Sequence, residues 1–323
     1  MTFRCALACL LALSASAAFA QDSTRKTKDD PAQIGNRDVG KGVNLYSLEK
    51  EMALGKQLAE EVQRQAKVVD DPLISEYINR IGQNLVRNSD AKVPFTFQVI
   101  EGESPNAFAL PGGYVFIYTA LLEIADEEDE LAAAMAHEIA HVAARHMTKQ
   151  ATKSQMVNLA GVPVGVILGG GIGGAVARQG AAAGLPAVFM HFTRQDEAEA
   201  DYLGVQYLYA AGYDPNGAIS IFEKLESLEK KQPGTVARIF STHPMDAARI
   251  QKTEQEIDRI LPARDEYVIN TSEYVAIRQR TIALEARKKA PEDGRPQLRT
   301  RQDESRQPGE PDRPTVRRWD LVE

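Results

Sequence analysis

Three histidines and one glutamate are concentrated in the stretch AAAMAHEIAHVAARH, which covers residues 132–146. His137 and His141 are four residues apart, so on a helix their imidazoles project from one face and can bind a Zn²⁺ ion together. Glu138 lies beside that face. Zinc lowers the pKa of a bound water to about 7, and a carboxylate can then take its proton as the water attacks a carbonyl carbon. The stretch therefore predicts hydrolytic metal chemistry.

The H-E-x-x-H spacing is typical of zinc metallopeptidases, although a surface helix can carry so short a pattern by chance. Residues 131–144 are otherwise apolar, which indicates a buried helix. Burying two imidazoles and a carboxylate is costly unless they are paired or bind a metal. The surroundings of the motif therefore favour a metal site.

A catalytic zinc takes three protein ligands, so a further ligand must come from elsewhere in the chain. The only two cysteines, Cys5 and Cys9, lie in an expected signal peptide, which leaves His, Asp and Glu as candidate ligands. The stretch RQDEAEADYLG (194–204) places Glu197 and Asp201 on one helical face. The economical assignment makes Glu197 the ligand and Asp201 an acceptor for an imidazole N–H. The alternative is a solvated acidic face.

Two further histidines have less specific contexts. His146 is expected to cap the end of the histidine helix, where a cation interacts favourably with the helix dipole. His243 lies in STHPMDAARI (241–250), a loop that enters a helix. A loop histidine is more often structural, but this one could also swing onto the metal.

Hydrophobic periodicity predicts a chain of the α+β class that is mostly α, with a small sheet packed beside the histidine helix. Strands are expected over residues 94–101 and 114–118. Helices are expected over residues 44–69, 70–89, 127–147, 195–211, 215–231, 246–261 and 272–289.

Changes in composition divide the chain into five expected regions. These are a signal peptide (1–20), a flexible leader (21–43), a zinc metallopeptidase domain (44–265), a C-terminal helix (266–289) and a disordered tail (290–323). Within the domain, the Gly- and Ala-rich residues 148–190 are expected to form a flap or loop. Pro163 and seven glycines between residues 157 and 177 disfavour a membrane-spanning helix, which leaves peripheral membrane contact through residues 157–190 as a further hypothesis.

The formal net charge of −7 becomes −8 if Arg4 is removed with the signal peptide. A mildly acidic chain is a poor candidate for binding nucleic acid. Export through the signal peptide predicts a periplasmic location.

Four motifs, taken in chain order, resemble the BepA-like periplasmic zinc metallopeptidases, a group related to HtpX and the CAAX prenyl protease. The resemblance covers about residues 44–262. The motifs are NAFALPGGYVFIYTALL (106–122), HEIAHVAARH (137–146), FTRQDEAEADYLG (192–204) and STHPMDAARI (241–250).

The resemblance implies a zincin-like fold with one zinc ion per chain. It implies that His137, His141 and Glu197 bind that ion. Glu138 would then act as the general base, and Asp201 would support the site from outside the ligand shell.

The resemblance also assigns roles to two residues of the fourth motif. His243 would approach the metal as a regulatory fourth ligand, and Arg249 would help to stabilise the oxyanion. The sequence departs from the BepA pattern because no C-terminal tetratricopeptide repeats are recognisable. That departure puts a BepA-like docking of partners in doubt.

Zincins hold an extended peptide against the edge of a small sheet above the metal. The expected edge strand contains Gly112, Gly113, Tyr114, Val115 and Phe116. The alternative is that this segment is an ordinary core strand.

Two functions remain open on the sequence alone. The first is a zinc endopeptidase of the cell envelope that hydrolyses misfolded or mis-assembled periplasmic or outer-membrane polypeptides. The second is a latent, chaperone-like binding module in which zinc is mainly structural. Glu138 favours the first function, because a structural zinc site does not need this carboxylate.

Overall fold

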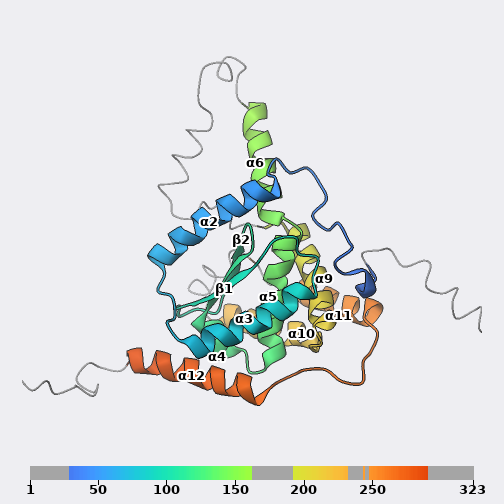
Figure 1. The fold of residues 1–323 in the computed structure, drawn as a ribbon. Helices are drawn as coiled ribbons and strands as arrows, with labels where there is room; N and C mark the ends of the chain where they lie inside the picture. The colour runs from blue at the N-terminus through green and yellow to red at the C-terminus, as the bar shows by residue number, and fades with distance from the viewer. Residues whose placement is uncertain (1–28, 162–191, 232–242, 244–246, 290–323) are drawn as a thin grey trace, which may run out of the picture.

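The computed structural model describes residues 29–161, 192–231, 243 and 247–289 (Figure 1). The expected signal peptide (1–20) and tail (290–323) lie outside the described residues. So do the start of the expected leader and residues 162–190 of the expected flap. No helix within the described ranges is both long enough and apolar enough to span a bilayer.

The described part of the chain contains a three-stranded sheet in the order β1-β3-β2. β1 (Thr96–Ile100) runs parallel to β3 (Tyr114–Tyr118), and β2 (Ala107–Leu110) runs antiparallel to β3. Gly112 and Gly113 make the turn from β2 to β3, with φ angles of 76° and 92°. This left-handed backbone region favours glycine because glycine has no Cβ.

The expectation that residues 112–116 form an edge strand is wrong. Tyr114, Val115 and Phe116 belong to β3, which is paired with a strand on each side, and the two glycines lie in the turn before it. The edge strand beside the histidine helix is β2, which was not expected from the sequence. Its alternate residues Ala107 and Ala109 have little intrinsic preference for strands, so the pairing with β3 decides the conformation.

Side chains of the sheet alternate between two helical layers. One face contacts α2 (Leu48–Gln65), and the other contacts α3 (Pro72–Arg87) and α5 (Glu128–Ala143). In β3, Phe116 packs with residues of α2, whereas Val115 and Ile117 pack in the cluster that contains residues of α3 and α5. This period of two is what a strand covered on both faces requires.

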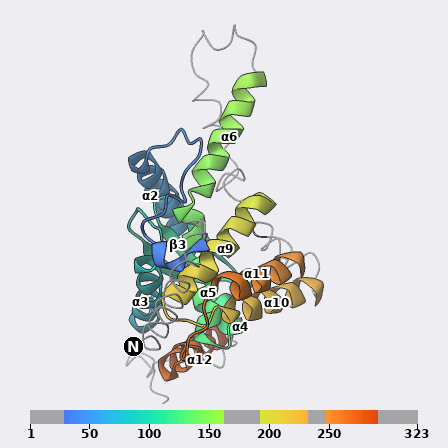
Figure 2. The same ribbon diagram turned by 90° about the vertical axis from the view of Figure 1, so that its right-hand side faces the viewer.

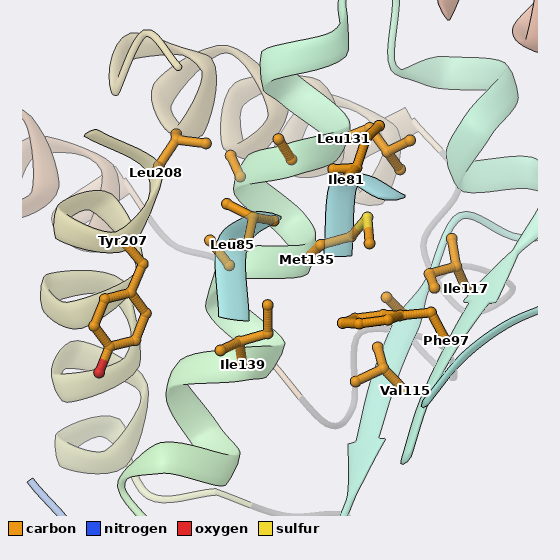
Figure 3. Close-up of a cluster of buried hydrophobic side chains, with 14 of the residues drawn as sticks. Ile81, Leu85, Phe97, Val115, Ile117, Leu131, Met135, Ile139, Tyr207 and Leu208 are labelled. Carbon is orange, nitrogen blue, oxygen red and sulfur yellow. The ribbon is translucent and has the colours of Figure 1, made fainter. Parts of the chain in front are cut away.

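The main core surrounds α5, which lies between the sheet and α9 (Arg194–Ala210). Alanines occupy much of α5, so neighbouring backbones can approach it closely. Figure 3 shows side chains from α3, α5, α9 and the sheet meeting in this core. The labelled residues are Ile81, Leu85, Phe97, Val115, Ile117, Leu131, Met135, Ile139, Tyr207 and Leu208.

Four further helices pack around these elements. α4 (Thr119–Ile124) follows β3 directly and contacts α12 (Ser272–Lys289). α10 (Asn216–Lys231) packs on α5, and α11 (Ala247–Ile260) packs on both α9 and α10. α11 thus lies against α9, which itself packs on the histidine helix α5 (Figure 2).

The histidine helix is shorter than expected from the sequence. α5 ends at Ala143, Arg145 has a φ of 59°, and a second helix, α6, spans His146–Gly161. A residue of positive φ just after a helix is a common helix terminator. α6 extends away from the rest of the molecule, at the end opposite α12 (Figures 1 and 2).

Part of the expected flexible leader is packed. Arg37 is buried, and its guanidinium donates to Asp90 at 2.6 and 3.0 Å and to Gln206 of α9 at 2.6 Å. Val39 belongs to the main core. The leader expectation was based on polar composition, and it missed this buried ion pair between residues far apart in the sequence.

Candidate metal centre

α5 and α9 bring His137, His141 and Glu197 together, although Glu197 is distant in sequence from the histidines. The two Nε2 atoms of His137 and His141 are 3.0 Å apart. Glu197 Oε2 is 3.5 Å from Nε2 of His137, and Glu197 Oε1 is 3.5 Å from Nε2 of His141. All three side chains are buried. Glu197 reaches the histidines from the first turn of α9, which begins with a capping box between Thr193 and Asp196.

His243 joins this group from the segment before α11. Its Nδ1 is 2.9 Å from Glu197 Oε1 and 3.3 Å from His137 Nε2. Its Nε2 is 3.4 Å from Glu138 Oε1. The four residues His137, His141, Glu197 and His243 each offer one ligand atom, and these atoms all lie within 4.8 Å of one another.

The spacing of these atoms fits a zinc ion. Ligands bound to tetrahedral zinc at 2.0–2.1 Å lie about 3.3 Å from one another. The Nε2 atoms of His137 and His141 are 3.0 Å apart, His243 Nδ1 is 3.3 Å from His137 Nε2, and each of the two Nε2 atoms is 3.5 Å from one Glu197 oxygen. These separations fall around that value, and no two of the four ligand atoms are more than 4.8 Å apart. Imidazole and carboxylate are also the ligand types that zinc prefers when no thiolate is present. The residues of this chain therefore suit the metal.

Asp201 orients the first histidine. Its Oδ1 is 3.0 Å from His137 Nδ1, so a proton on Nδ1 faces a carboxylate and leaves Nε2 as the nitrogen that can bind a metal. Arg249 of α11 donates to both oxygens of Asp201, at 2.7 and 2.9 Å, and its Nη1 is 2.9 Å from Glu197 Oε2. Arg249 thus fixes the two carboxylates relative to each other, in addition to any role toward substrate.

Glu138 is held between α5 and the sheet edge. Its Oε2 accepts a hydrogen bond of 2.9 Å from the backbone N–H of Ala109 in β2. Burial raises the pKa of Glu138, although His243 and His137 act in the opposite direction. A carboxyl group with a raised pKa is better matched to taking up a proton near neutral pH.

The ionisable side chains of the cluster shift one another's pKa values. Burial acts to lower the pKa of His137, but the carboxylates of Asp201 and Glu197 raise it to about 10. Burial and the neighbouring His137 together lower the pKa of His141. Burial acts to raise the pKa of Glu197, yet His243 and His137 hold it well below its ordinary range. The carboxylates thus attract a positive charge to this position, which a proton or a metal ion can supply.

An apolar pocket opens beside the cluster. Leu121, Ala134, Phe222 and Leu225 line it together with Glu138 and His243. The apolar lining of this pocket therefore lies directly beside Glu138.

Two residues near the cluster were not assigned to it from the sequence. His146 was expected to end a helix, but it begins α6 and is 1% exposed, with its Nδ1 3.0 Å from Nδ1 of His141. Glu199 of α9 has its Oε2 3.3 Å from His146 Nε2. The sequence contained only one sign of this role, a third histidine close to the motif. The contact of His146 with His141 could not be predicted, because it depends on the break between α5 and α6.

Phe192 adds an aromatic wall to the cluster. Its ring centroid lies 3.9 Å from that of His141 and 5.2 Å from that of His243. Packing of this kind restricts rotation of both imidazoles.

Comparison with known proteins gives one family and several relatives. The sequence model of Peptidase family M48 matches residues 72–257, which contain every residue of the cluster. The beta-barrel assembly-enhancing protease of Escherichia coli O157:H7 is 32% identical over 75% of this chain and 50% of its own length. The mitochondrial metalloendopeptidase OMA1 of Schizosaccharomyces pombe is 33% identical over 55% of this chain and 52% of its own length.

A third relative is covered more fully. The metalloprotease LoiP of Escherichia coli K12 is 31% identical over 61% of this chain and 77% of its own length. The chain spans about half the length of the first two relatives.

Proposed function

The chain belongs to Peptidase family M48, and on that premise we propose that it is a zinc-dependent endopeptidase of the cell envelope. Its proposed substrates are misfolded or mis-assembled periplasmic or outer-membrane polypeptides. The proposal for the catalytic domain rests mainly on one observation: two imidazole nitrogens and a carboxylate from two helices lie at zinc-ligand spacing beside the buried carboxylate of Glu138.

His137, His141 and Glu197 would hold the zinc ion. When bound, zinc supplies a Lewis acid that activates water and polarises a peptide carbonyl. The remaining chemistry belongs to the side chains around it. Asp201 keeps the proton of His137 on Nδ1, so that Nε2 faces the cluster with a free lone pair. Glu138 takes a proton from the attacking water on the oxygen that does not accept from Ala109, and it can pass that proton to the leaving amine.

The edge strand β2 is the proposed docking site for the substrate backbone. Phe108 lies directly opposite Phe116 of β3, and Asn106 O accepts from Tyr118 N. In an antiparallel pair this alternation turns the backbone groups of Ala107 and Ala109 away from β3. Ala109 N–H already donates to Glu138, so an extended peptide on this edge would pass beside the general base.

The envelope location and the substrate class are supported by two observations. The N-terminal residues 1–20 have the pattern of a secretory signal peptide. One relative is named a beta-barrel assembly-enhancing protease, which suggests substrates from outer-membrane assembly. Contact of residues 157–190 with a membrane stays a hypothesis, because most of that segment lies outside the described residues.

A second candidate function is a latent binding module in which zinc is mainly structural. It is favoured by the position of His243, whose Nδ1 completes a group of four ligand atoms. A zinc site closed by four protein ligands is usually structural. If the protein is an endopeptidase, His243 instead acts as a gate, because its side chain must move away from the cluster before substrate binds.

Hydrolysis of an unfolded protein tests both candidates. The purified chain would be incubated with casein as isolated, with excess chelator, and with one equivalent of zinc restored, alongside His243→Ala. The proposal predicts cleavage that chelator removes and zinc restores. Cleavage that is insensitive to chelator would refute the zinc mechanism. Absence of cleavage by both zinc-loaded proteins would favour the binding module.

A further inference from the structure

The second imidazole of the cluster, His141, contacts another imidazole on the side away from Glu197. Its Nδ1 is 3.0 Å from Nδ1 of His146, and Nε2 of His146 is 3.3 Å from the Glu199 carboxylate. His141 and His146 are 2% and 1% exposed, so water cannot readily replace the contact between the two imidazoles, whereas the Glu199 side chain is partly exposed. Glu199 of α9 therefore contacts His146 at the start of α6, and His146 contacts His141 of the metal centre.

When His146 is neutral, these two contacts allow only one placement of the protons. A carboxylate can only accept, so the hydrogen bond between Glu199 and His146 requires a proton on His146 Nε2. A neutral His146 then has a lone pair on Nδ1, which accepts from Nδ1–H of His141. With its proton on Nδ1, His141 presents an unprotonated Nε2 toward His137 and Glu197. If His146 instead donated to Nδ1 of His141, the proton of a neutral His141 would lie on Nε2 and prevent that nitrogen from binding a metal.

Local structure holds His146 in position. Arg145, with a φ of 59°, turns the chain between α5 and α6. Its guanidinium donates to the carboxylate of Glu51 at 2.7 Å and to the carbonyl oxygen of Tyr46 at 2.6 Å. A continuous helix would have carried His146 away from His141, because residues five apart do not share a helical face.

We propose that His146 is a positioning residue for the metal centre, which fixes the tautomer and ring orientation of His141, and that Glu199 is the terminal acceptor of this relay. The proposal rests on the proposed zinc site. It makes the two histidine ligands different: His137 is oriented directly by Asp201, and His141 is oriented by a carboxylate acting through a second imidazole.

The test compares the zinc affinity of His146→Leu and His146→Asn, measured by competition with a chromophoric chelator. Leu and Asn have similar shapes, but only Asn places an acceptor oxygen near the position of the imidazole Nδ1. Loss of such an orienting contact typically weakens metal affinity by about 10–100-fold. We expect that loss for His146→Leu, and an affinity within about threefold of wild type for His146→Asn. Met147→Ala, which removes a buried apolar contact at the same helix start, is the control for loosened packing.

Glu199 supplies a second, independent readout. Glu199→Leu should weaken zinc binding in the wild-type background but not in the His146→Asn background, because Asn has no group that corresponds to Nε2. The visible spectrum of the Co²⁺-loaded proteins would report the same change in ligand geometry without relying on activity.

Three outcomes would overturn the relay. They are a wild-type affinity in a folded His146→Leu variant, equal losses in the Leu and Asn variants, or an equal effect of Glu199→Leu in both backgrounds. A wild-type chain that binds no zinc would instead refute the proposed function itself.

Discussion

Gly204 of α9 sets how closely the two ligand-bearing helices approach. A Cβ added at this position would lie 3.3 Å from both Cα and N of His137 and 3.5 Å from the carbonyl carbon of Ala136. Carbon atoms in contact are normally about 3.5–4.0 Å apart, so Gly204→Ala must separate the backbones by roughly 0.3–0.5 Å. The displaced residue is itself a proposed ligand. Metal–ligand distances tolerate about ±0.2 Å, so this shift is larger than the site can absorb without rearrangement.

Gly204→Ala is therefore expected to weaken zinc binding by about tenfold, which corresponds to ~1.4 kcal/mol. Stability without metal should change less, because an overpacking cost of about 1–3 kcal/mol is partly offset by the better helix propensity of Ala, about 1 kcal/mol. Zinc affinity would be measured by chelator competition, and stability by urea unfolding in excess chelator. Gly204→Val should give larger losses in both.

Gly82 of α3 provides the matched control. A Cβ there would meet the Phe97 ring at 2.4–2.5 Å, and neither residue belongs to the cluster. Gly82→Ala should lower the free energy of unfolding and leave the zinc affinity of the folded protein unchanged. If Gly204→Ala and Gly204→Val both bind zinc as tightly as the wild type, the close helix approach does not determine the site.

Three other substitutions test separate parts of the account. Asp201→Ala removes the acceptor for His137 Nδ1–H and should weaken zinc binding by about 10–100-fold in chelator competition; an unchanged affinity would show that the contact does not orient the ligand. His243→Ala should increase the rate of casein cleavage at full zinc occupancy, whereas a lower rate in a folded variant would assign His243 to the reaction instead of a gate. Burial raises the pKa of Asp129 to about 7, with Glu127 adding to the effect, so the protonated acid stabilises the fold and this stability is lost as the pH rises from about 4 toward 7. Asp129→Asn should accordingly raise the free energy of unfolding by ~1–3 kcal/mol at pH 8 and by almost nothing below pH 4, as measured by urea unfolding; a gain that does not change with pH would contradict the assignment.

The elements that could be predicted from the sequence are those whose conformation is determined by neighbouring residues. α3 begins at Pro72 after the Asp71 cap, and its apolar side chains follow a helical period into the core. The β-branched and aromatic residues of β3 predicted a strand, and the α+β class with a small sheet beside the histidine helix is confirmed. A local pattern cannot show which strand lies at an edge, because the order β1-β3-β2 depends on pairing between segments.

The residues of the candidate site also divide into those that local spacing predicted and those that it could not. Helical spacing alone placed His137 with His141, and Glu197 with Asp201, on shared faces, and the structure then brings the two faces together. His146 could not be placed from sequence, since its contact with His141 depends on the positive φ of Arg145 between two helices. Helix termination by a non-glycine residue leaves no reliable signature in the sequence.

If Glu138 acts as a general base at a zinc centre, replacing its carboxylate must slow hydrolysis while zinc stays bound. Initial rates of casein hydrolysis would be measured for Glu138→Gln and for the unsubstituted protein at confirmed one-to-one zinc occupancy, each also in the His243→Ala background to remove latency. Gln has the shape of Glu and can still accept from Ala109 N–H, but it cannot take up a proton. The rate of Glu138→Gln should be lower by about 10²–10⁴-fold, with unchanged zinc affinity. Equal rates in the two proteins would show that Glu138 is not the general base.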